Sequence, residues 1–265
     1  MKDEALALVE GVDDPSRALN LLREYVQVLV LRSLHESEAF ANLAFVGGTA
    51  LRFLENLPRF SEDLDFSLVE GEGYDPETWL RKVRRDLALD GFDVRVTFNA
   101  KKTVQVSWVR IAGLLAEAGL AGRKEQRLSI KLEIDTRPPK GAELSRTLVV
   151  RHMPLAIRHH RLSSLMAGKL HALITRRYAK GRDWFDLLWY RGHRPPIEPR
   201  LPLLQNALDQ TQGQGRFDAA RWSDLVRARL EKINVAALRH EVGPFLERPA
   251  DAALLTADNL LSVLE

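Results

Sequence analysis

The sequence predicts an α+β fold in which a mixed sheet with covering helices is followed by a lobe built from helices. Two observations support this prediction. Short apolar or alternating runs, which are typical of strands, occur between residues 43 and 136. After about residue 155, helical periodicity is the pattern that remains. We therefore expect an α/β lobe over residues 1–155 and a helical lobe over residues 156–265.

The first elements have clear local signals. Residues 15–38 repeat apolar positions at helical spacing, and Pro15 suits the first turn of a helix. A short apolar strand over 43–46 then ends at Gly47-Gly48, and a helical period restarts at Ala50. This order predicts a strand, a glycine turn and a second helix.

The rest of the first lobe predicts one more helix among several strands. Residues 76–89 read as a helix with Pro76 in its first turn, which would cover the sheet. Strands are expected over 63–69, 92–98, 103–111 and 127–136. In the second lobe we expect helices over 162–178, 182–190, 201–208, 219–232 and 235–245.

Composition excludes several classes of protein. The 265 residues include no cysteine, which rules out disulfides, thiolate zinc sites and a cysteine nucleophile. The acidic start of the chain does not resemble a signal peptide, and no apolar run reaches the roughly 20 residues of a membrane span. A soluble cytoplasmic protein is expected.

The net charge of +3 is small, but the basic residues are concentrated in the middle of the chain. They form two clusters, Arg151, Arg158, His159, His160 and Arg161, and then Arg176, Arg177, Lys180 and Arg182. Such clusters are expected where phosphates bind. A solvated helix face is the alternative interpretation.

The chemistry is concentrated in GGTALRFLENLPRFSEDLDF, residues 47–66. The glycine pair would let backbone N–H groups at a helix N-terminus approach a phosphate. Asp63 and Asp65 are two apart on an expected strand, so both carboxylates project from one face and can share a cation that prefers oxygen ligands. An isolated pair of this kind is more often a solvated strand edge, but the glycine turn upstream favours a site.

A two-metal site needs a third carboxylate from another strand. In the strand SIKLEID, residues 129–135, Lys131, Glu133 and Asp135 share one face. Asp135 is the favoured third ligand and Glu133 is its substitute. A solvated sheet face with Lys–Glu pairs is the alternative.

Two motifs resemble those of a known protein family. Residues 47–66 are similar to the first motif of the AbiEii/AbiGii family, the nucleotidyltransferase toxins of type IV toxin–antitoxin systems, which include MenT-like toxins. A later family motif has a lysine, basic residues and an Arg-Asp pair followed by Asp-Leu, and residues 169–188, KLHALITRRYAKGRDWFDLL, resemble it. With the LEID strand, the similarity spans residues 45–190.

The resemblance implies a DNA-polymerase-β-like nucleotidyltransferase core, a helical lobe that completes the active-site cleft, and transfer from an NTP, in some relatives to the 3′ end of tRNA. On the expected helix, Lys169 and Arg176 are seven apart and would share a face that binds the triphosphate. Alternatively, Lys169 extends to solvent, and Asp183 and Asp186 are charges stabilised by a helix N-terminus.

In the expected mechanism, an acceptor hydroxyl attacks the α-phosphorus of an NTP and pyrophosphate leaves, with two Mg²⁺ ions stabilising the entering and leaving oxygens. The candidate residues are, as catalytic groups, Asp63, Asp65, Lys169 and Asp186; as metal ligands, Asp63, Asp65 and Asp135; as nucleotide contacts, Gly47, Gly48, Thr49, Ser61, Lys169, Arg176 and Asp183; and as RNA contacts, Arg158, Arg161, Arg177 and Lys180.

The expected function is that of a toxin that modifies tRNA and blocks translation and growth. Its expected partners are an NTP, tRNA or another RNA acceptor, and a cognate antitoxin that need not bind directly. Two alternatives remain, a non-catalytic RNA-binding module on the same fold and a transferase that modifies a small molecule of the antibiotic type. The intact Asp63/Asp65 pair counts against the first, and the basic clusters count weakly against the second.

Overall fold

The computed structural model describes residues 1–123 and 125–265 and divides the chain into two compact units. Unit 1 comprises residues 1–56, 60–137 and 146–159, and unit 2 comprises residues 57–59, 138–145 and 160–265. The expected boundary after residue 155 therefore lies four residues before the last change of unit. The two short segments of unit 2 that interrupt unit 1 have no counterpart in the expected division.

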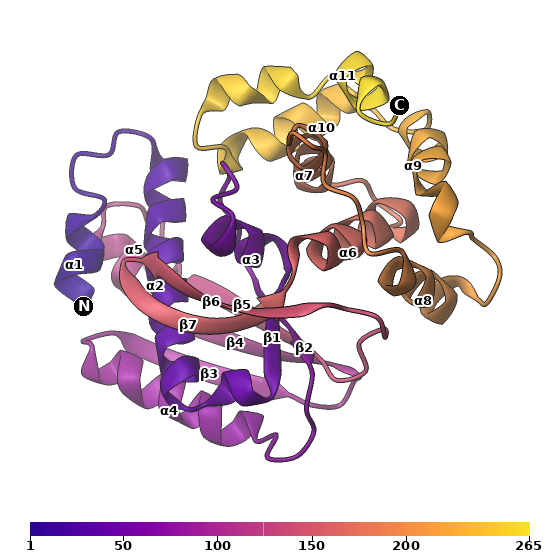
Figure 1. Ribbon diagram of the computed structural model, residues 1–265. Coiled ribbons are helices and arrows are strands. Elements are labelled where there is room, and N and C mark those ends of the chain that lie inside the picture. The colour runs from indigo at the N-terminus through magenta and orange to yellow at the C-terminus, as the bar shows by residue number, and fades with distance from the viewer. Residues whose placement is uncertain (124) are drawn as a thin grey trace. The chain divides into compact units, whose positions relative to one another are not determined.

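Across the described residues, seven strands form one mixed sheet in the order β3-β4-β5-β2-β1-β7-β6 (Figure 1). β1 is antiparallel to β2, β2 is parallel to β5, and β5, β4 and β3 continue as an antiparallel meander. The strands are β1 Leu43–Val46, β2 Leu64–Leu68, β3 Asp93–Asn99, β4 Val104–Ala112, β5 Leu128–Asp135, β6 Leu144–Arg151 and β7 Met153–His160. The predicted α+β fold with a mixed sheet is confirmed.

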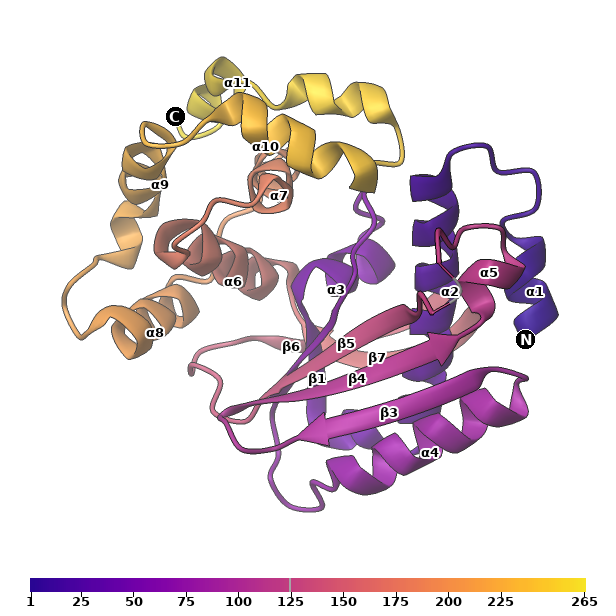
Figure 2. The ribbon, with the colours of Figure 1, turned by 180° about the vertical axis from the view of Figure 1, so that it is seen from behind.

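Helices α2 and α4 pack against each other and contact strands of this sheet, with α4 lying along β3 (Figure 2). The alternating buried positions of β5, such as Ile130 and Leu132, and the buried Leu64 and Phe66 of β2 supply the apolar face of the sheet. The helices of unit 1 are α1 Lys2–Ala7, α2 Pro15–Glu36, α3 Gly47–Leu54, α4 Pro76–Leu89 and α5 Leu114–Glu117, with the 3₁₀ turn η1 Ala39–Ala41.

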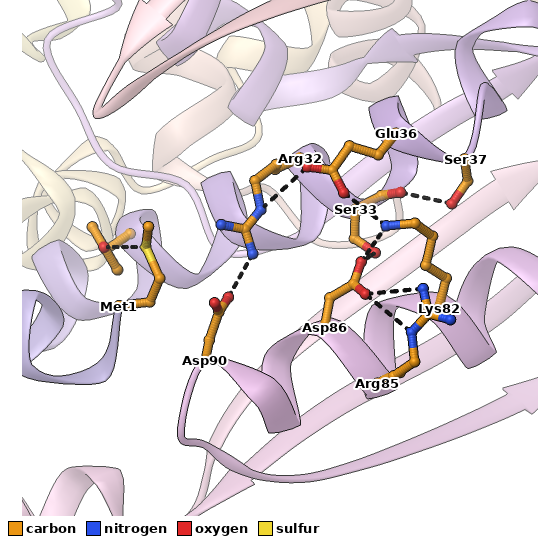
Figure 3. A network of polar contacts seen from close by, with 10 residues as sticks. Met1, Arg32, Ser33, Glu36, Ser37, Lys82, Arg85, Asp86 and Asp90 are labelled. Carbon is orange, nitrogen blue, oxygen red and sulfur yellow. Dashed lines mark hydrogen bonds and ion pairs between the residues drawn. The ribbon is translucent and has the colours of Figure 1, made fainter.

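Polar side chains also join α2 to α4 (Figure 3). Ser33 of α2 donates a hydrogen bond to Asp86 of α4 at 2.7 Å, and Lys82 contacts both Asp86 and Glu36. Burial raises the pKa of Asp86, but hydrogen bonds from Lys82 and Ser33 and the charge of Lys82 outweigh it and lower the pKa. The network helps to fix the helix layer beneath the sheet.

Unit 2 is built mainly from helices, as predicted. They are α6 Leu162–Thr175, α7 Gly181–Arg191, α8 Leu201–Gln212, α9 Trp222–Leu230, α10 Val235–Val242 and α11 Ala257–Ser262, with 3₁₀ turns η2 Ala219–Arg221, η3 Gly243–Phe245 and η4 Pro249–Leu254. Contacts of α6 with α7, α8 and α9 place it centrally in this unit. Trp184, Tyr190 and Leu204 are among its fully buried side chains.

The structure corrects several expected elements. Strands β6 and β7 were not predicted, and β7 extends to His160, where only helices were expected. His159 of β7 pairs with Phe45 of β1 and is buried, as is His160, so neither belongs to a solvated basic cluster. The helix expected over 162–178 ends at Thr175. No helix in the described part of the chain is long and apolar enough to cross a membrane.

Candidate active site

The two aspartates of the DLD sequence lie at the start of β2. Leu64 and Phe66 are buried against the core, so the alternation of the strand directs Asp65 to the opposite face. Asp63 directly precedes β2, and both aspartates act electrostatically on the same neighbour, Lys131. Both aspartates are half-buried. Because two like charges on one face disfavour each other's ionised form, this pair suits a position beside a cation.

Gly47 is matched to this carboxylate pair. Its φ of +80° is a conformation that glycine adopts readily, and β1 ends beside β2 with Val46 paired to Asp65. A Cβ atom at Gly47 would lie 2.2 Å from Oδ2 of Asp65. The carboxylate therefore occupies the space that the missing side chain leaves, and the glycine turn and Asp65 form one local structure.

Two buried polar side chains hold the segment that leads into β2. The hydroxyl of Thr49, which is fully buried, donates a hydrogen bond to the carbonyl of Asp63. The amide of Gln27 on α2 donates to the carbonyls of Ser61 and Glu62 at 3.1 and 2.9 Å. Thr49 was expected to contact phosphate through its hydroxyl, but this hydroxyl binds the backbone of the carboxylate strand instead.

Gln27 is a site-supporting residue that sequence reasoning missed. It is only 1% exposed and lies within a run of buried apolar residues on α2. A polar side chain on the buried face of a helix needs a hydrogen-bonding partner, and that rule is the signal that could have identified Gln27.

The N-terminus of α3 offers the groups that suit a phosphate. Helix α3 begins at Gly47 without a side-chain cap, so the backbone N–H groups of its first turn are suited to bind phosphate oxygens.

The parallel pairing of β2 with β5 defines the neighbours of the two candidate third carboxylates. Glu133 pairs with Asp65, whereas Asp135 pairs with Ser67, one position further along the face. Lys131 forms an ion pair with Glu133 at 2.7 Å, and Asp135 accepts the backbone N–H of Arg137 at 2.9 Å. The register thus places the substitute, Glu133, beside the aspartate pair.

The pKa of Lys131 is shifted by the carboxylates on this face. Burial lowers the pKa of Lys131, but its hydrogen bond to Glu133 and the negative charges of Glu133, Asp63 and Asp65 outweigh burial and raise the pKa. These three carboxylates therefore favour the charged form of Lys131.

The donor chemistry of this face fits magnesium. Within residues 1–123 and 125–265, no three His, Cys, Asp or Glu side chains form a complete metal-binding group. Mg²⁺ is commonly held by one or two carboxylates together with substrate phosphates and water, so the carboxylates of Asp63 and Asp65 would fit such a site. Glu133 or Asp135 would then either bind the metal ion as a further ligand or lie next to the residues that bind it.

A second acidic group lies within unit 2 and is surrounded by cations. Asp186 is fully buried, and its two oxygens accept hydrogen bonds from Nε and Nη2 of Arg59 at 2.6 and 2.7 Å. Lys169 contacts Asp186 at 2.8 Å and Asp183 at 3.1 Å, and Arg176 binds the other oxygen of Asp183. Burial alone would raise the pKa of Asp186, but the charges of Arg59 and Lys169 outweigh burial and lower it.

These contacts change how the later motif is understood. Because α6 ends at Thr175, Lys169 and Arg176 do not share a helix face as expected; Asp183, in the first turn of α7, brings them together. Arg59 had no predicted role, and it comes from the segment between the glycine pair and the two aspartates of the first motif. An arginine directly after Pro58 carries no periodic signal that would mark it as buried.

The expected RNA-binding residues have different surroundings. Arg158 lies on β7 in unit 1, is half-buried and donates to the carbonyl of Ala41 at 2.7 Å. Arg161, Arg177 and Lys180 are exposed in unit 2, where Arg177 lies 5.3 Å from the ring centre of the exposed Tyr178. Exposed basic side chains next to an aromatic ring suit contacts with a nucleic acid.

Comparison with solved structures defines the class of fold. A nucleotidyltransferase-like crystal structure from H. pylori matches with a TM-score of 0.55 at 21% identity, covering 92% of each chain. JHP933 from Helicobacter pylori matches with a TM-score of 0.51 at 19% identity, covering 92% of this chain and 90% of that one. MenT4, a nucleotidyltransferase toxin from Mycobacterium tuberculosis H37Rv, matches with a TM-score of 0.51 at 19% identity, covering 100% of this chain and 99% of that one. The chain has the fold of nucleotidyltransferases.

The family follows from the sequence profile of the AbiEii nucleotidyl transferase toxins of type IV toxin–antitoxin systems, which matches residues 29–258. The chain therefore belongs to this family, which confirms the resemblance drawn from its motifs. No curated protein sequence shows a significant match.

Proposed function

We propose that this family member is a Mg²⁺-dependent toxin that transfers a nucleotide from an NTP to the 3′ end of tRNA and thereby blocks translation and growth. The observation that carries the proposal is the pairing of Asp63 and Asp65 on one sheet face with the Gly47 turn against them. Positioning and electrostatic stabilisation supply most of the catalysis in phosphoryl-type transfer, and these residues suit both roles.

Asp63 and Asp65 would hold the cation, which when bound polarises the transferring phosphate and stabilises the oxygens that enter and leave. The turn at Gly47 and Gly48 presents the N-terminus of α3 to the phosphates. Gln27 and Thr49 hold the backbone carbonyls of residues 61–63, so that the carboxylates keep one geometry. This rigidity favours the orientation of the reacting groups.

In unit 2, we assign Lys169 and Arg176 to the triphosphate and Asp183 to their orientation, since Asp183 binds both. Asp186 acts on this group through Lys169 and Arg59 rather than on substrate, because its side chain is fully buried. Exposed Arg161, Arg177 and Lys180 would contact the RNA backbone. The cognate antitoxin is a further partner, and the setting is the cytoplasm.

The direct test is incubation of the purified protein with each labelled NTP, Mg²⁺ and total RNA, followed by separation of the RNA classes. We expect label in the tRNA fraction, removed by trimming of the 3′ end. Asp65→Asn should reduce labelling by about two to three orders of magnitude or more, because it removes a group that stabilises transition-state charge. Asp93→Asn, an exposed carboxylate at the start of β3, is the matched control and should label normally.

The outcomes separate the competing functions. RNA binding without any transfer would favour the non-catalytic module, and transfer to a small hydroxylated molecule but not to RNA would favour the antibiotic-type enzyme. In cells, expression of the wild type without an antitoxin should arrest growth, and Asp65→Asn should remove the effect. Normal growth on strong expression of wild-type protein would contradict the toxin assignment while leaving the transferase chemistry intact.

A further inference from the structure

The sheet face that carries Asp65 continues across three more strands of unit 1. Strand register aligns Asp65 with Glu133 on β5, Glu133 with Val106 on β4, and Val106 with Asn99 on β3. Residues that pair across neighbouring strands point to the same face, so these four side chains form a row that starts at the aspartate pair.

The next row along this face contains an aromatic side chain. Lys131 of β5 pairs with Trp108 of β4, which in turn pairs with Thr97 of β3. Trp108 is half-buried, although the residues on either side of it, Ser107 and Val109, are buried against the core. Neighbouring strands lie about 4.8 Å apart, so Trp108 is two strand spacings, roughly 10 Å, from the strand of Asp65.

A hollow of about 420 Å³ opens beside Trp108 near the turn between β3 and β4. Binding pockets for small ligands or ligand fragments are commonly about 300–1,000 Å³, so the hollow has room for one planar base. Its lining includes Trp108, Phe98, Val106, Thr97, Asn99 and Lys102. Aromatic rings together with donors and acceptors are the surroundings that an unpaired nucleobase requires.

Lys102 lines this hollow, and two arginines lie further along the same sheet face. The guanidinium of Arg110 lies 5.1 Å from the centre of the Trp108 ring, and it donates to the hydroxyl of Thr97 at 3.1 Å. Arg95 pairs with Arg110 across the strands and is exposed, and Lys102 is an exposed residue of the turn. The ring is therefore held in place by a cation, and positive charge is available for a phosphodiester backbone.

We propose that the hollow beside Trp108 binds the unpaired terminal base of the acceptor RNA strand, stacked on the indole ring. The inference rests on the proposed function, since it names where the acceptor of that reaction is held. In this proposal, Trp108 stacks on the base, and Lys102 and Arg95 bind phosphates of the RNA backbone. Arg110 holds the indole ring in place.

The order of the strands places the proposed site of the acceptor base and the proposed site of the NTP on opposite sides of β2. β2 lies between β1 and β5 in the sheet, and the Gly47 turn proposed for the phosphates of the NTP follows β1. Trp108 lies on the other side of β2, beyond β5. A nucleotide donor on the β1 side and an acceptor on the β5 side would meet at Asp63 and Asp65, which is the arrangement that transfer requires.

The test measures the affinity of the full-length protein, without NTP, for a short unstructured RNA oligonucleotide that has a free 3′ hydroxyl. Trp108→Leu keeps apolar bulk and removes the aromatic face, so the Kd should rise by about five- to one-hundred-fold. Trp108→Phe should recover most of the affinity. Leu148→Ala, at an exposed apolar side chain on β6 of the same sheet, should bind as the wild type does.

Two further measurements test the stacking and the phosphate contact separately. The oligonucleotide annealed into a blunt duplex should bind Trp108→Leu and wild type equally, because its terminal base is already stacked. Lys102→Ala, on an exposed turn, should lower the salt slope of binding by about 0.7. An unchanged Kd in Trp108→Leu, or an unchanged salt slope in Lys102→Ala, would overturn the inference.

Steady-state kinetics separate this inference from the proposed function. Trp108→Leu should raise the KM for RNA and leave the KM for the NTP within about two-fold of the wild type, since stacking is lost on the acceptor alone. A raised KM for the NTP with an unchanged KM for RNA would overturn the acceptor assignment and leave RNA labelling by the wild type intact. Absence of RNA labelling by the wild type would overturn both.

Discussion

The two units contain acidic groups in opposite electrostatic surroundings. On the sheet face of unit 1, Asp63 and Asp65 are half-buried next to a further carboxylate, Glu133, and Lys131 contributes one positive charge nearby. Neighbouring carboxylates disfavour one another's ionised form, and a bound cation relieves that repulsion, so the proposed metal ion suits this group.

In unit 2 the acidic side chains are bound by basic side chains of the same unit. Asp183 and Asp186 are buried, and Arg59, Lys169 and Arg176 bind them in a connected network. A buried charge is tolerated when it is paired and hydrogen-bonded, so this group is satisfied by the protein alone. The difference indicates that the first group is suited to a bound cation. In the second group, the buried Asp186 stabilises the surrounding structure, and Asp183 holds Lys169 and Arg176 together.

The largest expected effect tests this difference through folding stability. Asp186→Asn should lower the free energy of unfolding by about 3–5 kcal/mol, because Arg59 and Lys169 then lose their buried counter-charge. Asp65→Asn should leave it unchanged or raise it slightly, because the substitution relieves repulsion between carboxylates. Denaturant unfolding of both variants beside the wild type measures the two values.

A double variant serves as the control for the buried pair. Arg59→Met with Asp186→Leu replaces the pair by apolar side chains and should be more stable than Asp186→Asn alone, since no unpaired charge is left at Arg59. Equal destabilisation by Asp186→Asn and Asp65→Asn would remove the distinction between the two acidic groups.

The buried pair also predicts a pH dependence. Because the folded pKa of Asp186 is lowered relative to its unfolded value of about 3.9, the stability that its ionised form contributes is present above that pH. This contribution is lost as the pH falls through the folded pKa. The difference in stability between wild type and Asp186→Asn should therefore shrink below about pH 4, measured by thermal unfolding across a pH series.

The local parts of the site were predictable from sequence because their signals are local. The change from an apolar run to Gly47-Gly48 and back to helical period identified the β1–α3 turn, and alternation placed Asp63 and Asp65 on one face. The same alternation in residues 129–135 identified the strand that supplies Glu133. Period-two patterning determines the facing of side chains, but it contains no information on which strand lies next to which.

The parts that escaped prediction depend on long-range pairing. In β7 the buried positions alternate as in any strand, but they include His159, which resembles a basic surface residue until its pairing with β1 is known. Arg59 can be buried because its guanidinium forms a hydrogen-bonded ion pair with Asp186, which lies 127 positions later in the chain. The choice of Glu133 or Asp135 beside Asp65 likewise depends on the β2–β5 register, which no local pattern specifies.

A smaller effect tests the contact between the glycine turn and the carboxylates. Gly47→Ala adds a Cβ that would meet Asp65 at 2.2 Å in a backbone conformation that side chains rarely adopt. We expect about 1–3 kcal/mol of lost stability from this strain and a loss of transfer of about 10- to 100-fold, because Asp65, a proposed metal ligand, would be displaced.

Gly73→Ala isolates the conformational part of this effect. Gly73 has a φ of +75°, similar to that of Gly47, but a Cβ there would have no heavy atom within 4 Å. The Gly73→Ala variant should lose little stability and should label RNA normally. If both variants kept wild-type activity, the close approach of Gly47 to Asp65 would have no catalytic importance.

The smallest expected effect distinguishes the half-buried Lys169 of unit 2 from two exposed cations of the same unit. Arg177 and Lys180 are exposed in the segment between α6 and α7, whereas the side chain of Lys169 is 15% exposed and bound to Asp183 and Asp186. Loss of a phosphate contact reduces the salt slope of RNA binding by about 0.7–0.9, so Arg177→Ala with Lys180→Ala should reduce it by roughly 1.5. Lys169→Ala should leave the slope nearly unchanged and instead raise the KM for the NTP. RNA affinities across a salt series measure the slopes, and a slope in Lys169→Ala as shallow as in the double variant would place all three cations on one RNA-binding surface.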